Sequence, residues 1–408
     1  MSFDKDYCVR AAHCDHKATD EEIYDTLKRI TDPLDRSWEK LEAAKKIVIK
    51  MNIMMPEDRI VRFEGRRQEL VDDSVAEAVL QLLTERTTAN LFLADTSDSF
   101  GKTELNIRPL LEKYNVTYVE SNDPPFEVYD VPGGGMMFNR YQLSAVFKDA
   151  DAVVSVAKMK NHSFMGVTLC CKNLFGLPPK PPHGRRARTY FHHVIRLSYV
   201  LPDLGQITQP CLNIIDALTG QWGCEWGGEG RIADALIAGD HIISTDACGM
   251  WLMGHDPKSD WPTPPFKRDR SHILAAAEHG FGTVNLDEID FESEVEPPLA
   301  DFDSHDVDID EMAQLLKTGS AQGLYYREQH EKLADRFAGN FIYLQNHEVV
   351  WNGPDPTKAG NVQSVAGARP GDAVWLKKVD PEEEEGEHYE VYQDTLDRFE
   401  DQRFAYSG

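Results

Sequence analysis

The feature that most constrains this chain is a repeated succession of short apolar runs and helical stretches. The apolar runs are rich in β-branched residues and lie within 45–56, 89–99, 117–120, 151–157 and 211–217. Between them, segments 72–84 and 107–114 place apolar side chains on one stripe of a helix. This alternation predicts an α/β domain with a mainly parallel sheet flanked by helices. Ligands of such sheets bind where the carboxyl ends of the strands meet.

Four regions are predicted along the 408 residues. Residues 1–45 are expected to form an acidic helical lead-in, and residues 46–280 the α/β domain. Residues 281–329 read as an acidic connector leading into a helix over 312–338. Residues 330–408 are predicted to be a small, acidic, β-rich appendage with a hairpin at Asn346–His347.

The negative charge of the chain is unevenly distributed. There are 69 acidic and 43 basic residues, a formal net charge of −26. Residues 281–408 hold 29 acidic and 10 basic residues, so this part alone carries −19. By contrast, residues 152–202 contain eight Lys and Arg but no Asp or Glu. Their counter-charges must come from elsewhere in the fold, from solvent or from a ligand.

Composition also limits the partners and the compartment. A strongly acidic chain disfavours binding to nucleic acid or to an anionic membrane surface. No run approaches the roughly 18–20 apolar residues that span a bilayer, and no signal peptide is recognisable. Seven scattered cysteines indicate reduced thiols, so a cytoplasmic location is expected. Cys8, His13, Cys14 and His16 could ligate zinc but match no standard spacing.

The densest segment for chemistry is 153–178, which reads VVSVAKMKNHSFMGVTLCCKNLFGLP. If the strand continues, alternation places Lys158, Lys160 and His162 on one face near its carboxyl end. Ser163 could cap a helix beginning near Gly166, which would make a cradle for carboxylate or phosphate. Alternatively, Lys172 lies at the C-terminal end of a short helix that Gly176 terminates, and only complements the helix dipole.

This segment resembles the DUF362 family, whose pattern is close to P-K-x-K-T-H-x-x-x-G-x-T-x-x-x-K-N-x-x-G. Ala157 and Asn161 depart from the pattern, and the matching positions are Lys158, Lys160, His162, Gly166, Thr168, Lys172, Asn173 and Gly176. Similar family blocks occur at 45–56, where Asn52 is retained, and at 89–99, 212–223 and 236–257. The resemblance covers about 46–280 and implies a site that includes Asn52, Thr168 and Asn173.

Many members of that family carry ferredoxin-like cysteine clusters. This chain has no such spacing, and the adjacent Cys170 and Cys171 cannot imitate it. A 4Fe–4S cluster is therefore not expected, and the metal content is left open. The resemblance implies a fold and a site, but no particular reaction.

Further residues are candidates for the same site. Asp216 follows a buried apolar run, where a carboxylate can face the ligand crevice and balance a lysine. Asp246 is expected near a helix start, where it either caps the helix or binds a ligand. The Pro-rich loop 178–189 carries His183, Arg185 and Arg186, which suit either an anion-clamping lid or an oligomer contact.

The sequence favours an enzyme that acts on a small anionic metabolite. Lys160 or Lys172 would transfer a proton or form a Schiff base, because neighbouring cations lower the pKa of a lysine. His162 would be a general acid or base, and Lys158 would help to bind the anion. The alternatives are a non-catalytic binding or scaffold protein and a redox or metal-dependent accessory protein. Whether the chain forms a homo-oligomer is left open.

Overall fold

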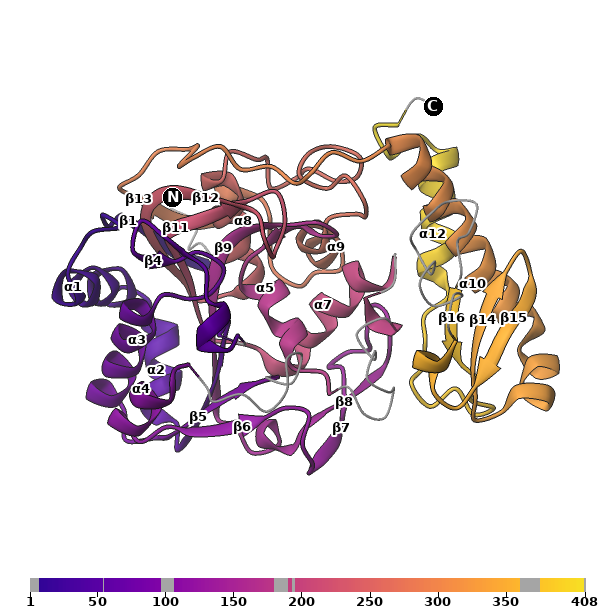
Figure 1. Ribbon diagram of the computed structural model, residues 1–408, viewed down its shortest axis with the longest axis horizontal. Helices are drawn as coiled ribbons and strands as arrows, with labels where there is room; N and C mark the ends of the chain where they lie inside the picture. Colours follow the sequence, from indigo (N-terminus) through magenta and orange to yellow (C-terminus); the bar gives the residue numbers. More distant parts are fainter. Residues whose placement is uncertain are drawn as a thin grey trace.

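The computed structural model describes residues 7–53, 55–96, 106–179, 190–192, 195–359 and 375–406. Its centre is a mixed sheet in the order β13-β1-β12-β11-β9-β2-β5-β6, with β10 paired to β9 (Figure 1). The strands are β1 (Tyr7–His13), β2 (Lys46–Met51), β5 (Asn90–Asp95), β6 (Thr117–Glu120), β9 (Ala152–His162), β10 (Gly166–Thr168), β11 (Leu212–Trp222), β12 (Glu229–Gly239) and β13 (Ile289–Ser293). The predicted α/β fold with a mainly parallel sheet is confirmed.

The order in which strands are added to the sheet reverses at its middle, between β2 and β9. From β2 the chain proceeds to β5 and β6 on one side, and from β9 to β11 and β12 on the other. β2 and β9 are parallel neighbours, with Met51 opposite Val156. At such a reversal the connections leave to opposite sides, so a crevice opens between the carboxyl ends of the two central strands.

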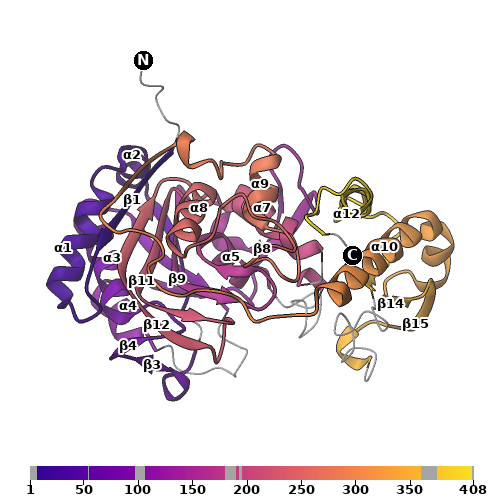
Figure 2. The ribbon, with the colours of Figure 1, turned by 90° about the horizontal axis from the view of Figure 1, so that it is seen from above.

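Helices cover both faces of the sheet (Figures 1 and 2). On one face lie α1 (Asp20–Thr31), α2 (Asp35–Ala43), α3 (Asp73–Arg86) and α4 (Arg108–Lys113). On the other lie α5 (Cys170–Asn173), α7 (Arg196–Thr208), α8 (Ile242–Leu252) and α9 (His272–Glu278). Short 3-10 turns occupy Glu57–Arg59, Ala145–Phe147, Leu174–Gly176, Leu286–Glu288 and Pro356–Lys358.

The two apolar cores follow directly from side-chain alternation along the central strands. In β9, Val154 and Val156 join the core under α1 to α4, whereas Val153 and Ala157 join the opposite core. Every residue of β9 is buried. A strand covered on both faces needs a nearly continuous apolar run, and in 152–157 only Ser155 is polar.

Two strands at one side of the sheet, β13 at its edge and β1 next to it, were not predicted. Residues 1–45 were expected to be helical, but β1 pairs antiparallel with β12 and parallel with β13. Strand β13 itself lies in the segment expected to be an irregular connector. Both strands are short and contain charged residues, and their partners are more than 200 residues distant from β1. Local sequence therefore carries little signal for either strand.

The C-terminal unit combines a small sheet with two helices (Figure 1). Its antiparallel sheet has the order β15-β14-β16, and its members are β14 (Phe341–Gln345), β15 (Glu348–Gly353) and β16 (Trp375–Lys378). Asn346 and His347 both have positive φ at the β14–β15 turn, which confirms the predicted hairpin. The helices are α10 (Ile309–Phe337) and α12 (Glu390–Glu400).

Two further ribbons complete the described structure. β3 (Arg62–Phe63) pairs with β4 (Arg66–Arg67), and β7 (Phe126–Asp130) pairs with β8 (Arg140–Ser144). A search of the described helices finds none with the length and apolarity to cross a membrane.

Candidate active site

A cavity of about 110 Å³ opens at the carboxyl ends of β2 and β9. It therefore lies at the crevice that the reversal of strand order creates. Its lining comes from both central strands, from α5 and from the loop after β11. The lining residues are Lys50, Asn52, Lys160, His162, Thr168, Lys172, Asn173, Phe175, Gly176, His192, Glu225 and Trp226.

Contacts of Lys50 and Asn173 connect the elements that form the floor of this cavity. The Lys50 amine lies 3.2 Å from an Asp95 carboxylate oxygen and donates to Asn173 Oδ1 at 2.8 Å. Asn173 in turn donates to main-chain oxygens of β2 and β9, those of Lys50 and Val156, at 3.1 Å each. The amide of Asn173 thus fixes α5 against both central strands.

Gly176 permits a close approach to the Lys50–Asp95 pair. A Cβ atom at this position would lie 2.6 Å from Asp95 Oδ1 and 2.6 Å from Lys50 Cε. In the alternative prediction Lys172 lies at the end of a short helix, and α5 does end at Asn173 with Lys172 in its last turn. Gly176 is not its left-handed terminator, however, because its φ is not in the left-handed region. The role of Gly176 is steric: it leaves room for a buried ion pair.

His162 is held in one tautomer by the backbone after β9. Its Nδ1 accepts hydrogen bonds from the amides of Phe164 at 2.9 Å and Met165 at 3.2 Å. An acceptor nitrogen carries no proton, so the proton of the neutral ring is on Nε2. Burial, reinforced by the positive charge of Lys172, lowers the pKa of His162 well below its usual value. His162 is therefore a neutral donor at neutral pH, with Nε2 3.7 Å from Glu225 Oε1.

Lys160 is a buried amine without a direct carboxylate partner among the described residues. Its Nζ donates to the main-chain oxygens of Glu69 at 2.7 Å and Glu225 at 3.2 Å. The Trp226 ring centroid lies 4.4 Å from Nζ. Burial lowers the pKa of Lys160 to about 8, partly countered by the charges of Glu69 and Glu225. An amine with this pKa exchanges its proton close to neutral pH.

Glu225 supplies a negative charge to the cavity wall. Its Oε2 accepts from the Ser163 amide at 3.0 Å and from the Ser163 hydroxyl at 2.7 Å. Burial alone would raise the pKa of Glu225, but these hydrogen bonds and the charge of Lys172 lower it. Ser163 therefore positions Glu225 and does not cap a helix. Residues 166–168, where that helix was expected, form β10.

Two polar atoms in the wall have no hydrogen-bond partner among the described residues. They are Asn52 Oδ1 and Thr168 Oγ1, and both are shielded from solvent. An unpaired buried polar atom costs free energy, and native structures rarely tolerate one. These two atoms are available to a bound ligand.

Lys158 and Asp216, both predicted to bind the ligand, do not line the cavity. The Lys158 amine lies 3.1 Å from Asp216 Oδ2, and both side chains are fully buried. The Asp216 strand does not end at this residue but continues to Trp222, which places the carboxylate inside the sheet layer. Asp216 thus balances a lysine, as expected of it, but that lysine is Lys158.

Asp246 also has a different position from the predicted one. It lies inside α8, not at its start, and does not line the cavity. Its carboxylate accepts from the amides of Cys170 and Cys171 at 2.8 Å each. It therefore caps the neighbouring helix α5, in which Lys172 is the third of four residues.

The predicted site residues thus divide into three groups. Lys160, His162, Lys172, Asn52, Thr168 and Asn173 share the cavity. Lys158, Asp216 and Asp246 support the strands and helix that surround it. His183, Arg185 and Arg186 of the predicted lid lie outside the described residues.

Sequence reasoning missed Lys50, Glu225, Trp226 and His192. Lys50 could have been predicted from the sequence, because it lies two residues before Asn52 in an expected buried strand. Glu225 and Trp226 belong to a loop reached only after β11, and nothing local indicates that this loop folds over β9. His192 stacks on His162 with ring centroids 5.7 Å apart, a contact that only the tertiary fold creates.

Two known proteins and one family model are similar to parts of this chain. A thylakoid-associated protein of Synechocystis sp. is 24% identical over 243 residues, covering 57% of this chain and 70% of that protein. The lactate racemase apoprotein from Thermoanaerobacterium thermosaccharolyticum shares 15% identity with a TM-score of 0.36. That match covers 60% of this chain and 56% of the racemase chain. The family model described as "Domain of unknown function (DUF362)" matches residues 47–251, which include both central strands and the cavity residues they carry. The chain belongs to the DUF362 family.

Proposed function

We propose that this protein is an enzyme that binds a small carboxylate metabolite in the β2–β9 cavity and transfers a proton through Lys160. The observation that carries the proposal is the convergence of Lys160, Lys172 and the Nε2–H group of His162 on one cavity. Its place at the carboxyl edge of the two central strands is where α/β folds hold their ligands.

The charges around the cavity favour a ligand with a single negative charge. Lys50, Lys160 and Lys172 line the cavity. Each of these lysines already has a carboxylate near it: Asp95 beside Lys50, Glu69 acting on Lys160, and Glu225 acting on both Lys160 and Lys172. His162 adds no charge because its pKa is lowered. A ligand with two negative charges would therefore be poorly compensated, and a buried charge without compensation is costly.

The size of the cavity favours a ligand of a few heavy atoms. An engineered protein cavity of about 150 Å³ accommodates benzene. The present cavity of about 110 Å³ is smaller than that. A short carboxylate fits this space better than a phosphorylated sugar or a nucleotide does.

The hydrogen-bond pattern divides the roles among the residues. His162 Nε2–H would donate to an oxygen of the bound metabolite, and it would not act as a base because its Nδ1 already accepts two amides. Lys160, with a pKa of about 8, is the group able to accept and return a proton at neutral pH. Lys172 would attract the carboxylate. The orphan oxygens of Asn52 and Thr168 would accept from a hydroxyl of the ligand.

Binding is tested with the full chain by titration calorimetry against acetate, glycolate, oxalate and inorganic phosphate. We expect the monoanions acetate or glycolate to bind, and Lys160→Met to weaken that binding by at least tenfold. The matched control is Lys45→Met, because Lys45 is exposed just before the amino end of β2. Binding that is equal for wild type and Lys160→Met would refute the site.

Turnover is tested by incubating the protein with glycolate and longer 2-hydroxy and 2-oxo acids in deuterium oxide. Proton transfer at carbon would place deuterium in the recovered acid, which nuclear magnetic resonance detects. Loss of the exchange in Lys160→Met would support the enzyme. Selective binding with no exchange for any acid in the panel would support a non-catalytic binding protein instead.

A further inference from the structure

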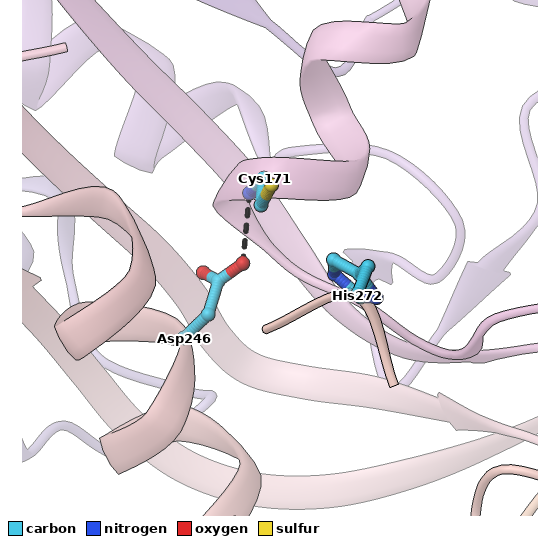
Figure 3. A group of neighbouring side chains, drawn as sticks. All are labelled: Cys171, Asp246 and His272. Carbon is cyan, nitrogen blue, oxygen red and sulfur yellow. Dashed lines mark hydrogen bonds between the residues drawn. The ribbon is translucent and has the colours of Figure 1, made fainter. Parts of the chain in front are cut away.

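A second group of chemistry-bearing side chains lies outside the cavity. Cys171 of α5, Asp246 of α8 and His272 of α9 converge from three different elements (Figure 3). All three residues are buried, and one ligand atom from each lies within 4.8 Å of the other two. Cys171 directly precedes Lys172, so the group is next to the cavity wall without being part of it.

His272 is the member of this group that packing alone does not explain. It is fully buried, and neither ring nitrogen has a hydrogen-bond partner among the described residues. A neutral imidazole carries one donor and one acceptor, and leaving both unsatisfied in the interior is unfavourable. One ring nitrogen is among the atoms that face Cys171 and Asp246.

Backbone hydrogen bonds orient the Asp246 carboxylate and leave it able to bind a further partner. Its two carboxylate oxygens each accept one backbone amide, from Cys170 and Cys171, at 2.8 Å. A carboxylate offers about four lone-pair directions, so these two amide bonds do not exhaust the capacity of Asp246 to accept or bind. The cap orients the carboxylate, as second partners commonly do for metal ligands.

We propose that the Sγ atom of Cys171, the carboxylate of Asp246 and a ring nitrogen of His272 bind one transition-metal ion, with Zn²⁺ as the expected metal. The donor set of sulfur, nitrogen and oxygen is typical of zinc and disfavours calcium and magnesium, which prefer oxygen ligands. Three protein ligands leave a fourth tetrahedral position for water or another small ligand.

The charges of such a site would balance. On binding, the Cys171 thiol releases its proton to solvent as the metal–sulfur bond forms. The thiolate and the Asp246 carboxylate then carry two negative charges against the two positive charges of the ion. The complex is neutral overall, which suits a site with no exposure to solvent. The neutral His272 contributes its nitrogen lone pair, which satisfies one of its two unpaired atoms.

The experiment uses the full chain after removal of metals with a chelator. The protein is dialysed against ZnCl₂ or CoCl₂, and bound metal per chain is measured by mass spectrometry. We expect one ion per chain and, with Co²⁺, the near-ultraviolet charge-transfer absorption of a thiolate ligand. A second group of potential ligands, Asp15, His16 and Asp234, contains no cysteine and cannot produce this absorption.

The ligands are assigned with Cys171→Ala and His272→Gln, both of which should lose the bound ion. The matched control is Cys248→Ala, because Cys248 is a fully buried cysteine on α8 outside the group. This control should retain both the ion and the cobalt absorption. If the ligand variants fail to fold, alkylation of the wild-type protein decides instead: bound Zn²⁺ should protect Cys171 during partial unfolding.

The proposal is overturned if the wild-type protein retains no ion, or if Cys171→Ala keeps the cobalt absorption. It is equally overturned if bound Zn²⁺ fails to protect Cys171. These measurements need neither a carboxylate ligand nor turnover. The proposed metal site and the proposed enzymatic activity can therefore be refuted independently of each other.

Discussion

Lys158 and Asp216 are Cα partners on the parallel strands β9 and β11, and their side chains form a fully buried ion pair with atoms 3.1 Å apart. The Lys158 amine also donates to Thr219 Oγ1 at 3.2 Å, and Asp216 accepts from the Asp72 amide at 2.8 Å. Asp72 begins α3 as its N-cap. The pair therefore joins β9, β11 and α3.

Removing one member of this pair should destabilise the fold strongly. Lys158→Met leaves Asp216 buried without the cation that faces it, and such a change costs about 3–5 kcal/mol. Urea unfolding monitored by circular dichroism measures the loss, with Lys45→Met expected within about 0.5 kcal/mol of wild type. The double variant Lys158→Met/Asp216→Leu should recover part of the loss. A cost below that of an ordinary surface substitution for Lys158→Met would contradict the role of the pair.

Gly176→Ala should impair the cavity. The new Cβ would lie 2.6 Å from Asp95 Oδ1 and Lys50 Cε, so the ion pair on the cavity floor must shift. We expect carboxylate affinity to fall at least tenfold, measured by titration calorimetry with glycolate. Gly319→Ala is the matched control, because a Cβ on α10 at this position meets only Ile195 Cδ1 at 3.9 Å. Unchanged affinity in Gly176→Ala would show that the cavity floor does not position the ligand.

Binding of a carboxylate should weaken as the pH rises through about 8. Below that pH Lys160 is protonated and attracts the anion, whereas above it the amine is neutral. His162 stays neutral and Glu225 ionised over this range, because the pKa values of both groups are lowered. Well above pH 8 the affinity for glycolate should fall by about tenfold per pH unit.

The control for this pH dependence is Lys160→Arg. A guanidinium keeps its charge at every accessible pH, so any remaining affinity should be flat between pH 7 and about 9. A fall in affinity that is identical in Lys160→Arg and wild type would assign the titration to another group.

Acid should loosen the C-terminal unit through Glu387. This carboxylate lies 2.9 Å from Arg196 of α7 and 2.7 Å from the Lys377 amine, and all three residues are buried. Burial opposes its ionisation, yet the charges of Arg196 and Lys377 lower the pKa of Glu387 to about 2. A lowered folded-state pKa stabilises the native state fully above the unfolded value of about 4.5, and this contribution is lost as pH falls toward 2.

Glu387→Gln should therefore be less stable than wild type at neutral pH and should lose less stability on acidification. Hydrogen exchange of α12 at neutral pH and at pH 3 measures both effects. Glu382→Gln is a suitable control, because Glu382 is exposed and is also in the C-terminal unit. Equal acid sensitivity of Glu387→Gln and wild type would exclude this carboxylate as the acid-labile contact.

Much of the central fold was predictable from local pattern. The apolar runs at 45–56, 89–99 and 151–157 became neighbouring parallel strands, because β-branched runs with flanking helices have few other ways to bury both faces. The cavity residues Lys160 and His162 were predicted because they follow such a run. The edge strand β13 and its neighbour β1 were not predicted, since their pairing depends on partners far away in sequence.

The basic stretch 152–202 illustrates which properties of this protein the sequence determined and which only the tertiary structure decided. The sequence alone showed that its cations lack local carboxylates, and that some of them lie beside buried strands. The fold decided which cations are neutralised: Asp216 pairs with Lys158, and Glu387 with Arg196. An ion pair requires atoms within about 4 Å, and such proximity between distant residues is set by strand register and domain contacts. Lys160 receives no carboxylate in this way among the described residues, and it is therefore the lysine that we propose for catalysis.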